Sequence, residues 1–223
     1  MTNYVFEDGE IEDINFHLFK VEKSFGIKFA KNENEHITTY GEFCDHIANK
    51  IQLEHSGDCT TQQAFYKLRN AISSKFKIDH KTITTDCQII DILPRRNRHK
   101  KIAELEKYLG FKLNILRPPH LVTMTLLVLC FVSLVGIYFN WQIGILGLII
   151  SMGGIWVADK IGIELEVKTV GELAKKMARE NYLKSRRNSK TFNKHEIEKI
   201  LTDWFSNDLG LDRSKLVRDA KFA

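Results

Sequence analysis

Two cysteines and two histidines in the first sixty residues have the residue types and the spacing of a metal site. Thiolates and imidazoles at such spacing are ligands that zinc accepts. A simpler interpretation places the first cysteine among apolar neighbours on a helix, where a small buried thiol is ordinary. We therefore predict no metal cofactor and keep zinc binding as the alternative. The pattern, Cys-x-His followed by His-x-x-x-Cys, consists of Cys44, His46, His55 and Cys59.

Sequence motifs of catalysis do not occur in the chain. It contains no G-x-S-x-G, H-E-x-x-H or phosphate-loop pattern, and its glycines at 144–154 lie in an apolar run. The cysteines, which also include Cys87 and Cys130, form no C-x-x-C pair and are expected to be reduced thiols of a cytosol-facing protein. We expect neither an enzyme nor a bound cofactor.

A basic cluster precedes a predicted amphipathic helix in the middle of the chain. Positive charge is unfavourable at a helix N-terminus, so we expect a role outside the helix. Residues 1–60 carry a net charge near −7 and the remainder near +12, within a total of +5. Anionic lipid and nucleic acid both attract such charge, but no nucleic-acid-binding motif accompanies it. We predict lipid or partner binding, and no nucleic acid, for Arg95, Arg96, Arg98, Lys100 and Lys101.

A long uncharged run follows this cluster. Residues 121–158, which are 38 residues, contain no Asp, Glu, Lys or Arg. A single helix of this length would measure about 57 Å, well beyond a hydrocarbon core of about 30 Å. The polar residues Asn140 and Gln142 break the run. We predict two spans, at 121–139 and 143–158, joined by a tight turn. A buried helical pair in a soluble protein is the alternative.

The residues around this run predict its packing and orientation. The second span contains Gly144, Gly147, Gly153 and Gly154, and small residues allow close helix approach. Lysines and arginines flank the run on both sides, whereas its turn has none. The positive-inside rule then places both soluble parts in the cytoplasm. We predict a multi-pass protein of an inner (cytoplasmic) membrane with both termini cytoplasmic.

The soluble parts of the chain contain an internal repeat. Three pairs of segments align without gaps, with apolar positions and several loop residues in common. Both copies read as one helical unit with a first helix and loop, a second helix and a third helix. The aligned pairs are "KVEKSFGIKF" at 20–29 with "ELEKYLGFKL" at 104–113, "ITTYGEFCDHI" at 37–47 with "VKTVGELAKKM" at 167–177, and 64–89 with 197–222.

The repeat predicts particular helix ends. Gly26 and Gly110 each follow a last helical turn and fit the left-handed conformation. Thr39 and Thr169 each precede a glutamate by three residues, which is the capping-box pattern at a helix start. We therefore expect helices to end at the two glycines and to begin at the two threonines.

The order of the repeated parts along the chain is unusual. The membrane hairpin interrupts copy two before its last helix, and copy one is split between the chain ends. Neither end can bury its apolar face alone, so we expect the two to form one domain, within one chain or between two. The predicted parts are 1–54 and 191–223 for copy one, 61–117 and 161–183 for copy two, the hairpin at 118–160, and a mobile basic linker at 184–190.

The repeated unit resembles the acyl carrier protein family. "EKILTDWFSNDLGLDRSKLVRDAKF" is similar to that family's first helix and loop, and "VEKSFGIKFAKNENEHITTYGEFCDHI" to its second-helix end and later helices. The resemblance implies an all-α fold with two small acyl-carrier-like bundles, besides the two-helix transmembrane hairpin. Carriers of this family hold phosphopantetheine on a serine at the start of the second helix. The equivalent places, near Ile11 and near Arg95 or Arg96, contain no serine, so we expect no acyl cargo.

These features predict a non-catalytic, membrane-anchored interaction or scaffold protein of bacterial type. Besides the lipid bilayer, the resemblance implies partners among the enzymes of lipid or polyketide synthesis that dock carrier proteins. An anionic-lipid-binding or membrane-sensing protein that uses the basic cluster is the alternative function. Carrier docking uses an acidic helix face, which the N-terminal copy offers with Glu7, Asp8, Glu10, Glu12 and Asp13.

Overall fold

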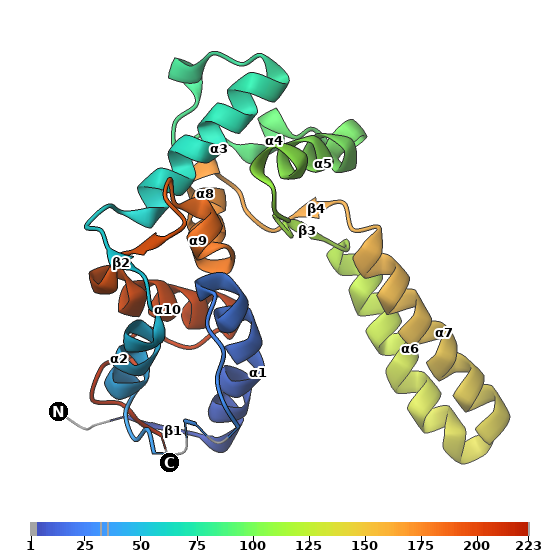
Figure 1. Ribbon diagram of the computed structural model, residues 1–223. Coiled ribbons are helices and arrows are strands. Elements are labelled where there is room, and N and C mark those ends of the chain that lie inside the picture. The colour runs from blue at the N-terminus through green and yellow to red at the C-terminus, as the bar shows by residue number, and fades with distance from the viewer. Residues whose placement is uncertain (1–3, 32, 35, 223) are drawn as a thin grey trace. The chain divides into compact units, whose positions relative to one another are not determined.

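The computed structural model describes residues 4–31, 33–34 and 36–222, and most of these are helical (Figure 1). This confirms the all-α class. The chain divides into two compact units. We call residues 1–86 with 170–223 the terminal unit, and residues 87–169 the hairpin unit. The hairpin unit is wider than the predicted hairpin at 118–160, and the assignment of its flanking segments to a second carrier-like copy stays a prediction.

The terminal unit is built from helices with two short strand pairs. Its strands are two residues long and pair in parallel, β1 with β6 and β2 with β5. The helix α3 packs against α8 and α9, and α10 packs against α2 and α8. The elements are β1 (Val5–Phe6), α1 (Asp8–Phe25), α2 (Tyr40–Lys50), β2 (Glu54–His55), α3 (Thr60–Phe76), η1 (His80–Thr82), α8 (Val170–Glu180), α9 (Tyr182–Ser185), β5 (Thr191–Phe192), α10 (Lys194–Asp208) and β6 (Lys221–Phe222).

The two ends of the chain share one hydrophobic core. α10 has an apolar stripe at helical spacing, and its Trp204 and Phe205 are fully buried in a cluster with Val21 of α1. The strand pair β1–β6 brings the two ends together, and the buried ring of Phe6 stacks there on that of Phe222 with centroids 5.0 Å apart. The core therefore closes within a single chain.

The predicted helix ends are confirmed where the structure describes their caps. Gly26 and Gly110 follow α1 and α5 (Arg98–Leu109) with φ of 66° and 79°. Thr39 accepts a hydrogen bond from the Glu42 amide, and Glu42 accepts one from the Thr39 amide, each 3.2 Å long. The helix α8 begins directly after Thr169. Local sequence signals thus set where these helices begin and end.

The same hydrogen bonds recur after the aligned glycines. The Phe29 amide donates to Glu22 Oε1 over 2.7 Å, and the Leu113 amide donates to Glu106 Oε1 over 2.9 Å. The two glutamates occupy the same position of the alignment, as do the two amides. Each carboxylate satisfies a backbone donor in the loop that leaves its helix.

The loops that follow the first helix of each copy, α3 and α10, also correspond. Asp79 Oδ1 accepts from the Lys81 amide over 3.1 Å, and Asp212 Oδ1 accepts from the Ser214 amide over 2.9 Å. These are aligned residues that make aligned bonds. An aspartate that bonds the amide two residues later stabilises a turn, and both copies turn the chain in this way.

The third helix of each copy, α2 and α8, donates a hydrogen bond from its first turn to an equivalent carbonyl group. The Gly41 amide donates to Arg218 O over 2.9 Å, and the Gly171 amide donates to Thr85 O over 2.8 Å. A Cβ at these glycines would lie 2.9 and 3.0 Å from the same oxygens. In both copies the close approach of two backbones excludes a side chain.

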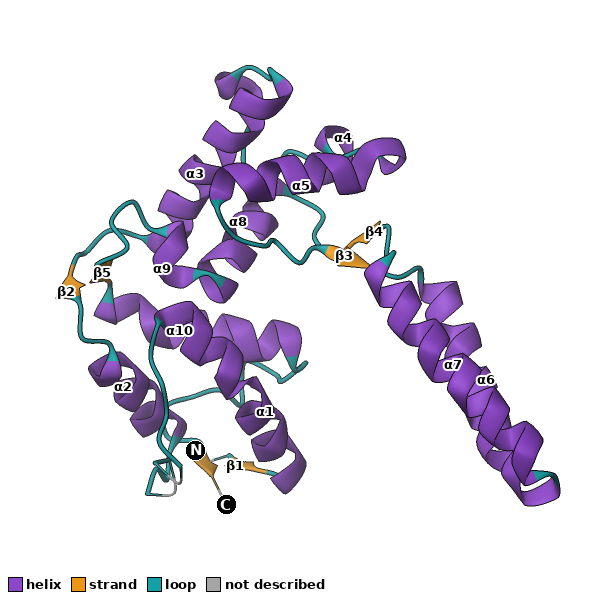
Figure 2. Ribbon diagram, turned by 45° about the vertical axis from the view of Figure 1, so that its right-hand side comes forward, coloured by secondary structure: helices purple, strands orange, loops and turns teal. Residues whose placement is uncertain are grey.

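The hairpin unit consists of two long helices and a small base. At the base, β3 and β4 pair antiparallel, Leu116 with Leu165 and Arg117 with Glu164 (Figure 2). The elements are α4 (Ile89–Ile92), η2 (Arg95–Asn97), α5, β3 (Leu116–Arg117), α6 (His120–Phe139), α7 (Trp141–Lys160) and β4 (Glu164–Leu165).

The turn of the hairpin is a single residue, Asn140. Its Oδ1 accepts hydrogen bonds from the amides of Gln142 and Ile143, over 3.1 and 3.3 Å, and so caps the start of α7. The predicted polar break is confirmed. The second helix is 20 residues long and extends beyond the predicted 143–158, since Trp141 and Lys160 are helical.

Glycines bring the two long helices together. A Cβ at Gly144 would lie 2.5 Å from the backbone nitrogen of Ile137, so the helices meet at van der Waals contact of their backbones. Gly147 and Gly154 also face α6 side chains at distances that exclude a Cβ. Gly153 faces open space, and its predicted part in the packing was wrong.

The basic segment at 184–190 is not the mobile linker that its sequence suggested. Arg186 is fully buried, and its Nη1 donates to Thr60 Oγ1 over 2.5 Å and lies 3.3 Å from Glu196 Oε1. The same carboxylate oxygen accepts the Tyr182 hydroxyl over 2.7 Å. A buried charge requires such pairing, and this one joins three separate segments of the terminal unit.

Replacement of Trp204 by alanine should destabilise the terminal unit by about 3–5 kcal/mol, because the ring is fully buried. The test is urea unfolding of the full chain in detergent, followed by tryptic cleavage within residues 1–51. Phe16→Ala is the matched control: that ring is 72% exposed, and its loss should change the free energy of unfolding by less than about 0.5 kcal/mol. Equal effects of the two substitutions would show that the chain ends do not share a core.

Candidate functional site

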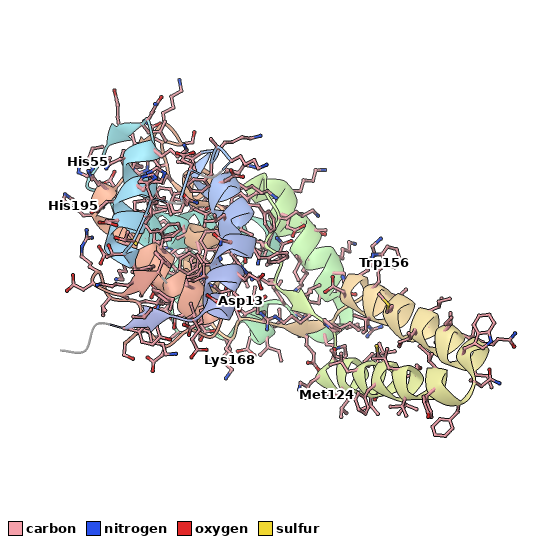
Figure 3. The ribbon with its side chains drawn as sticks, turned by 90° about the horizontal axis from the view of Figure 1, so that it is seen from below. Asp13, His55, Met124, Trp156, Lys168 and His195 are labelled. Carbon is pink, nitrogen blue, oxygen red and sulfur yellow. The ribbon has the colours of Figure 1, made fainter. Side chains whose placement is uncertain are left out.

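The two long helices expose an apolar surface that is unfavourable in water. Each has 20 residues and is long and apolar enough to cross a membrane. Large apolar side chains are exposed at both ends of α6, Leu121 at 80% and Phe139 at 82%. Figure 3 shows Met124 and Trp156 on this surface. A helix of this length spans about 30 Å, the thickness of a bilayer hydrocarbon core.

Aromatic residues mark both ends of the apolar surface. Tyr138 and Trp141 are exposed at the turn. At the other end, the Lys160 ammonium lies 3.7 Å from the centroid of the Trp156 ring. Aromatic rings and lysines prefer the boundary between hydrocarbon and water. The hairpin therefore has the composition of a membrane-spanning element along its whole length.

The basic cluster does not form a single surface. Arg95, Arg96 and Lys100 are exposed and can meet an external anion. Arg98 is buried: its Nε donates to Leu93 O over 2.9 Å, and its Nη1 donates to Ile163 O. Its place in an external patch is thus corrected, whereas ligand binding by the exposed three stays a prediction.

The partners of Arg98 and Lys101 explain why cations occupy the first turn of α5. Lys101 Nζ donates to Ile92 O over 2.8 Å, and Ile92 is the last residue of α4. Arg98 bonds the next carbonyl, that of Leu93. Carbonyls at a helix C-terminus lack helical donors and attract cations. Burial, and then the nearby Arg95 charge, lower the pKa of Arg98. Two of the five cations thus stabilise the end of α4.

The base of the hairpin depends on a close backbone contact. A Cβ at Gly162 would lie 2.6 Å from the carbonyl carbon of Arg117, so only glycine fits. The Glu166 amide donates to Ile115 O over 2.9 Å, and Arg117 Nη2 lies 2.7 Å from Glu166 Oε1. These contacts fix the end of α7 beside the segment that enters α6.

An open groove of about 700 Å³ lies at this base, within the hairpin unit. α5 contributes one wall, the segment at 112–117 the second, and the end of α7 the third. Both signs of charge line it. The charged and polar lining residues are His99, Glu106, Lys112, Asn114, Arg117, Asp159, Lys160 and Glu166.

The four residues of the possible zinc site have different surroundings. Cys44 is buried in the core, and Cys59 is exposed. His46 Nε2 lies 3.1 Å from Glu33 Oε1, and the ring of His55 packs against that of His195 at 5.4 Å (Figure 3). Among the described residues, no three His, Cys, Asp or Glu side chains converge on one point. Sequence spacing did not reveal the contact with His195, since that residue lies far along the chain.

The acidic residues of α1 divide into internal and external groups. Glu10 accepts the Tyr4 hydroxyl over 2.7 Å and pairs with Lys215 Nζ at 3.0 Å. Asp8, Glu12 and Asp13 are exposed. The same helix exposes two aromatic rings, Phe16 and Phe19, at 72% and 55%. Adjacent exposed rings on a folded domain often mark a contact surface.

Comparison of the chain with models of protein families, with curated proteins and with solved structures found no match.

The two cysteines of the possible zinc site should differ in reactivity. Burial raises the pKa of the Cys44 thiol to about 12, so only about one thiol in ten thousand is ionised at pH 8, and the thiolate is the reactive form. We expect iodoacetamide to modify the exposed Cys59 long before Cys44, as measured by peptide mass spectrometry. Modification in urea is the control and should label both. Equal labelling in the folded chain would contradict the burial of Cys44.

Proposed function

We propose that the protein is a non-catalytic scaffold, anchored in a membrane by the α6–α7 hairpin. The observation that carries the proposal is the exposed apolar surface of the two helices, in which the charged residues Asp159 and Lys160 stand only at the last two positions of α7. In water this surface would be far larger than the apolar patches that soluble monomers tolerate. In a bilayer the same residues contact hydrocarbon, and the helical backbone satisfies its own hydrogen bonds.

The domains outside the bilayer are carrier-like helical units without a carrier's chemistry. The support is the recurrence of loop hydrogen bonds in both copies, together with the alignment of three helical parts. The places where a carrier would hold its prosthetic group are occupied by Ile11 in α1 and by Arg95 and Arg96 in η2. A thioester arm needs a hydroxyl for its attachment, so these units serve recognition rather than acyl transfer.

The docking surface that we propose is the exposed side of α1. Phe16 and Phe19 provide an apolar centre, and Asp8, Glu12 and Asp13 place negative charge on its N-terminal side. Aromatic side chains of this kind carry much of the energy at interfaces. The complementary partner is a basic helix or groove with an apolar centre, as in carrier-dependent enzymes of lipid or polyketide synthesis.

A second function is favoured by the exposed part of the basic cluster. Arg95, Arg96 and Lys100 are exposed in the unit that contains the hairpin. Each such cation near an anionic membrane surface contributes about 1 kcal/mol of attraction. A membrane-sensing protein would use these side chains to respond to the fraction of anionic lipid.

The membrane anchor predicts that alkaline carbonate will not extract the full chain from membranes. Val128→Arg should impair insertion by about 2.5–3.5 kcal/mol, because the side chain lies in the middle of α6. Val217→Arg is the matched control on the exposed surface of the terminal unit and should change nothing.

Reporter fusions at both ends should report the cytoplasm. Extraction of the unaltered chain by carbonate would refute the anchor, and opposite locations of the two ends would refute the hairpin topology.

The docking surface predicts a specific cross-link. A photo-reactive phenylalanine analogue at position 16 should capture a carrier-dependent enzyme in cells, and the double substitution Glu12→Lys with Asp13→Lys should reduce the yield at least tenfold. The same analogue at Tyr108, an exposed ring on α5, is the control and should not capture that enzyme. Identical products from positions 16 and 108 would contradict the proposed surface.

A further inference from the structure

The groove at the base of the hairpin has the size of a small-molecule site and lies at the ends of the two long helices. Its volume of about 700 Å³ lies within the range of ligand pockets. Arg117 stands three residues before α6, and Asp159 and Lys160 are the last residues of α7. A hairpin that spans a bilayer places these residues beside the lipid headgroups. This position beside the headgroups rests on the proposed membrane anchor.

The charges of the groove are balanced. Its lining has three cations and three carboxylates, which sum to zero with His99 neutral. A site for anionic lipid would have an excess of cations. A balanced site with both signs within one groove is complementary to a zwitterion, which carries a phosphate and an ammonium a few ångströms apart. The charges are those of Lys112, Arg117, Lys160, Glu106, Asp159 and Glu166.

Two of the six charges have no ionic partner in the part of the chain that the structure describes. Lys112 Nζ pairs with Glu106 Oε2 at 2.6 Å, and Arg117 pairs with Glu166. Asp159 is exposed, and the described residues offer its carboxylate neither a hydrogen bond nor an ion pair. Lys160 contacts only the face of Trp156. An unpaired carboxylate among lipid phosphates is unfavourable unless a cation joins it. Its neighbour in the sequence, Lys160, has no carboxylate partner among the described residues and is suited to the phosphate.

The lining also distinguishes between kinds of ammonium. Quaternary ammonium groups are recognised by cages of aromatic rings. Among the described residues, no Phe, Tyr or Trp lines the groove, and the nearby Trp156 ring is occupied by Lys160. A primary ammonium instead donates charge-assisted hydrogen bonds to a carboxylate, and Asp159 offers one. The groove therefore favours ethanolamine over choline.

We propose that the groove binds the headgroup of an ethanolamine phospholipid, with the ammonium at Asp159 and the phosphate at Lys160. The shared chemistry is a phosphodiester that carries a primary ammonium, and we assign it to a bilayer lipid because the groove opens beside the membrane-spanning helices. Bound lipid would join α5, the hairpin entry and the hairpin exit at one point, since each contributes a wall.

The test compares lipids that the full chain retains after reconstitution in nanodiscs with equal amounts of phosphatidylethanolamine and phosphatidylcholine, measured by native mass spectrometry after release in mild detergent. The unaltered chain should retain the ethanolamine lipid at least tenfold over the choline lipid. Asp159→Asn should lower this ratio to near one, and Lys160→Gln should reduce retention of both lipids. Asp91→Asn changes an exposed aspartate of the same unit and should preserve the preference.

Each contrary result has a distinct meaning. Equal retention by the unaltered chain, or a preserved preference in Asp159→Asn, would overturn the proposal. Glycerophosphoethanolamine, which has the headgroup without acyl chains, should compete weakly, and binding as tight as that of the lipid would overturn the assignment to a bilayer lipid. Carbonate extraction of the same variants separates the two levels. A chain that stays in the membrane without lipid preference refutes the groove alone, whereas a chain that is extracted refutes the anchor.

Discussion

Burial of the apolar stripes on the terminal helices is the constraint on which the terminal unit depends. α10 cannot bury Trp204 and Phe205 by itself, and α1 cannot bury Val21 and Phe25 by itself. Each large side chain left in water would cost about 1.5–3 kcal/mol. The two ends of the chain therefore form one core, and the strand pair β1–β6 follows from their proximity.

The repeat shows that an apolar helical hairpin can be inserted into a helical unit while the loop hydrogen bonds shared with the other copy are kept. Equivalent glycines, glutamates and aspartates make equivalent bonds in both copies, although one copy is split between the chain ends and the other contains the hairpin. The bonds concerned lie in loops and at helix starts, where the chain can be interrupted without opening a helix. The hairpin adds an apolar surface of its own while these shared hydrogen bonds are kept.

The parts of the structure that sequence could predict are those with local physical causes. Gly26 and Thr39 act within one turn of their own position, and Asn140 interrupts an apolar run that is otherwise unbroken. The burial of Arg98 and Arg186 could not be predicted, because they bond carbonyls and side chains from other segments. The shared glutamate of the two aligned segments, Glu22 and Glu106, was an available signal for their common hydrogen bonds. The groove at the hairpin base needed the pairing of β3 with β4, and two-residue strands leave no periodic pattern.

The union of the chain ends has a consequence for biogenesis. The contact of Lys215 with Glu10 spans 205 residues, so the N-terminal helices leave the ribosome long before their partner helix is made. At about 5–20 residues per second, this interval lasts on the order of ten seconds or more. In the proposed membrane topology, the hairpin emerges and inserts within this interval, while α1 and α2 still lack the apolar side chains of α10. The exposed apolar faces of α1 and α2 are then a substrate for chaperones. With the proposed anchor, the terminal unit is completed only after the hairpin has inserted. With the proposed anchor, premature termination between α7 and α10 would leave an anchored chain with an exposed core, which is the form that membrane quality-control proteases recognise.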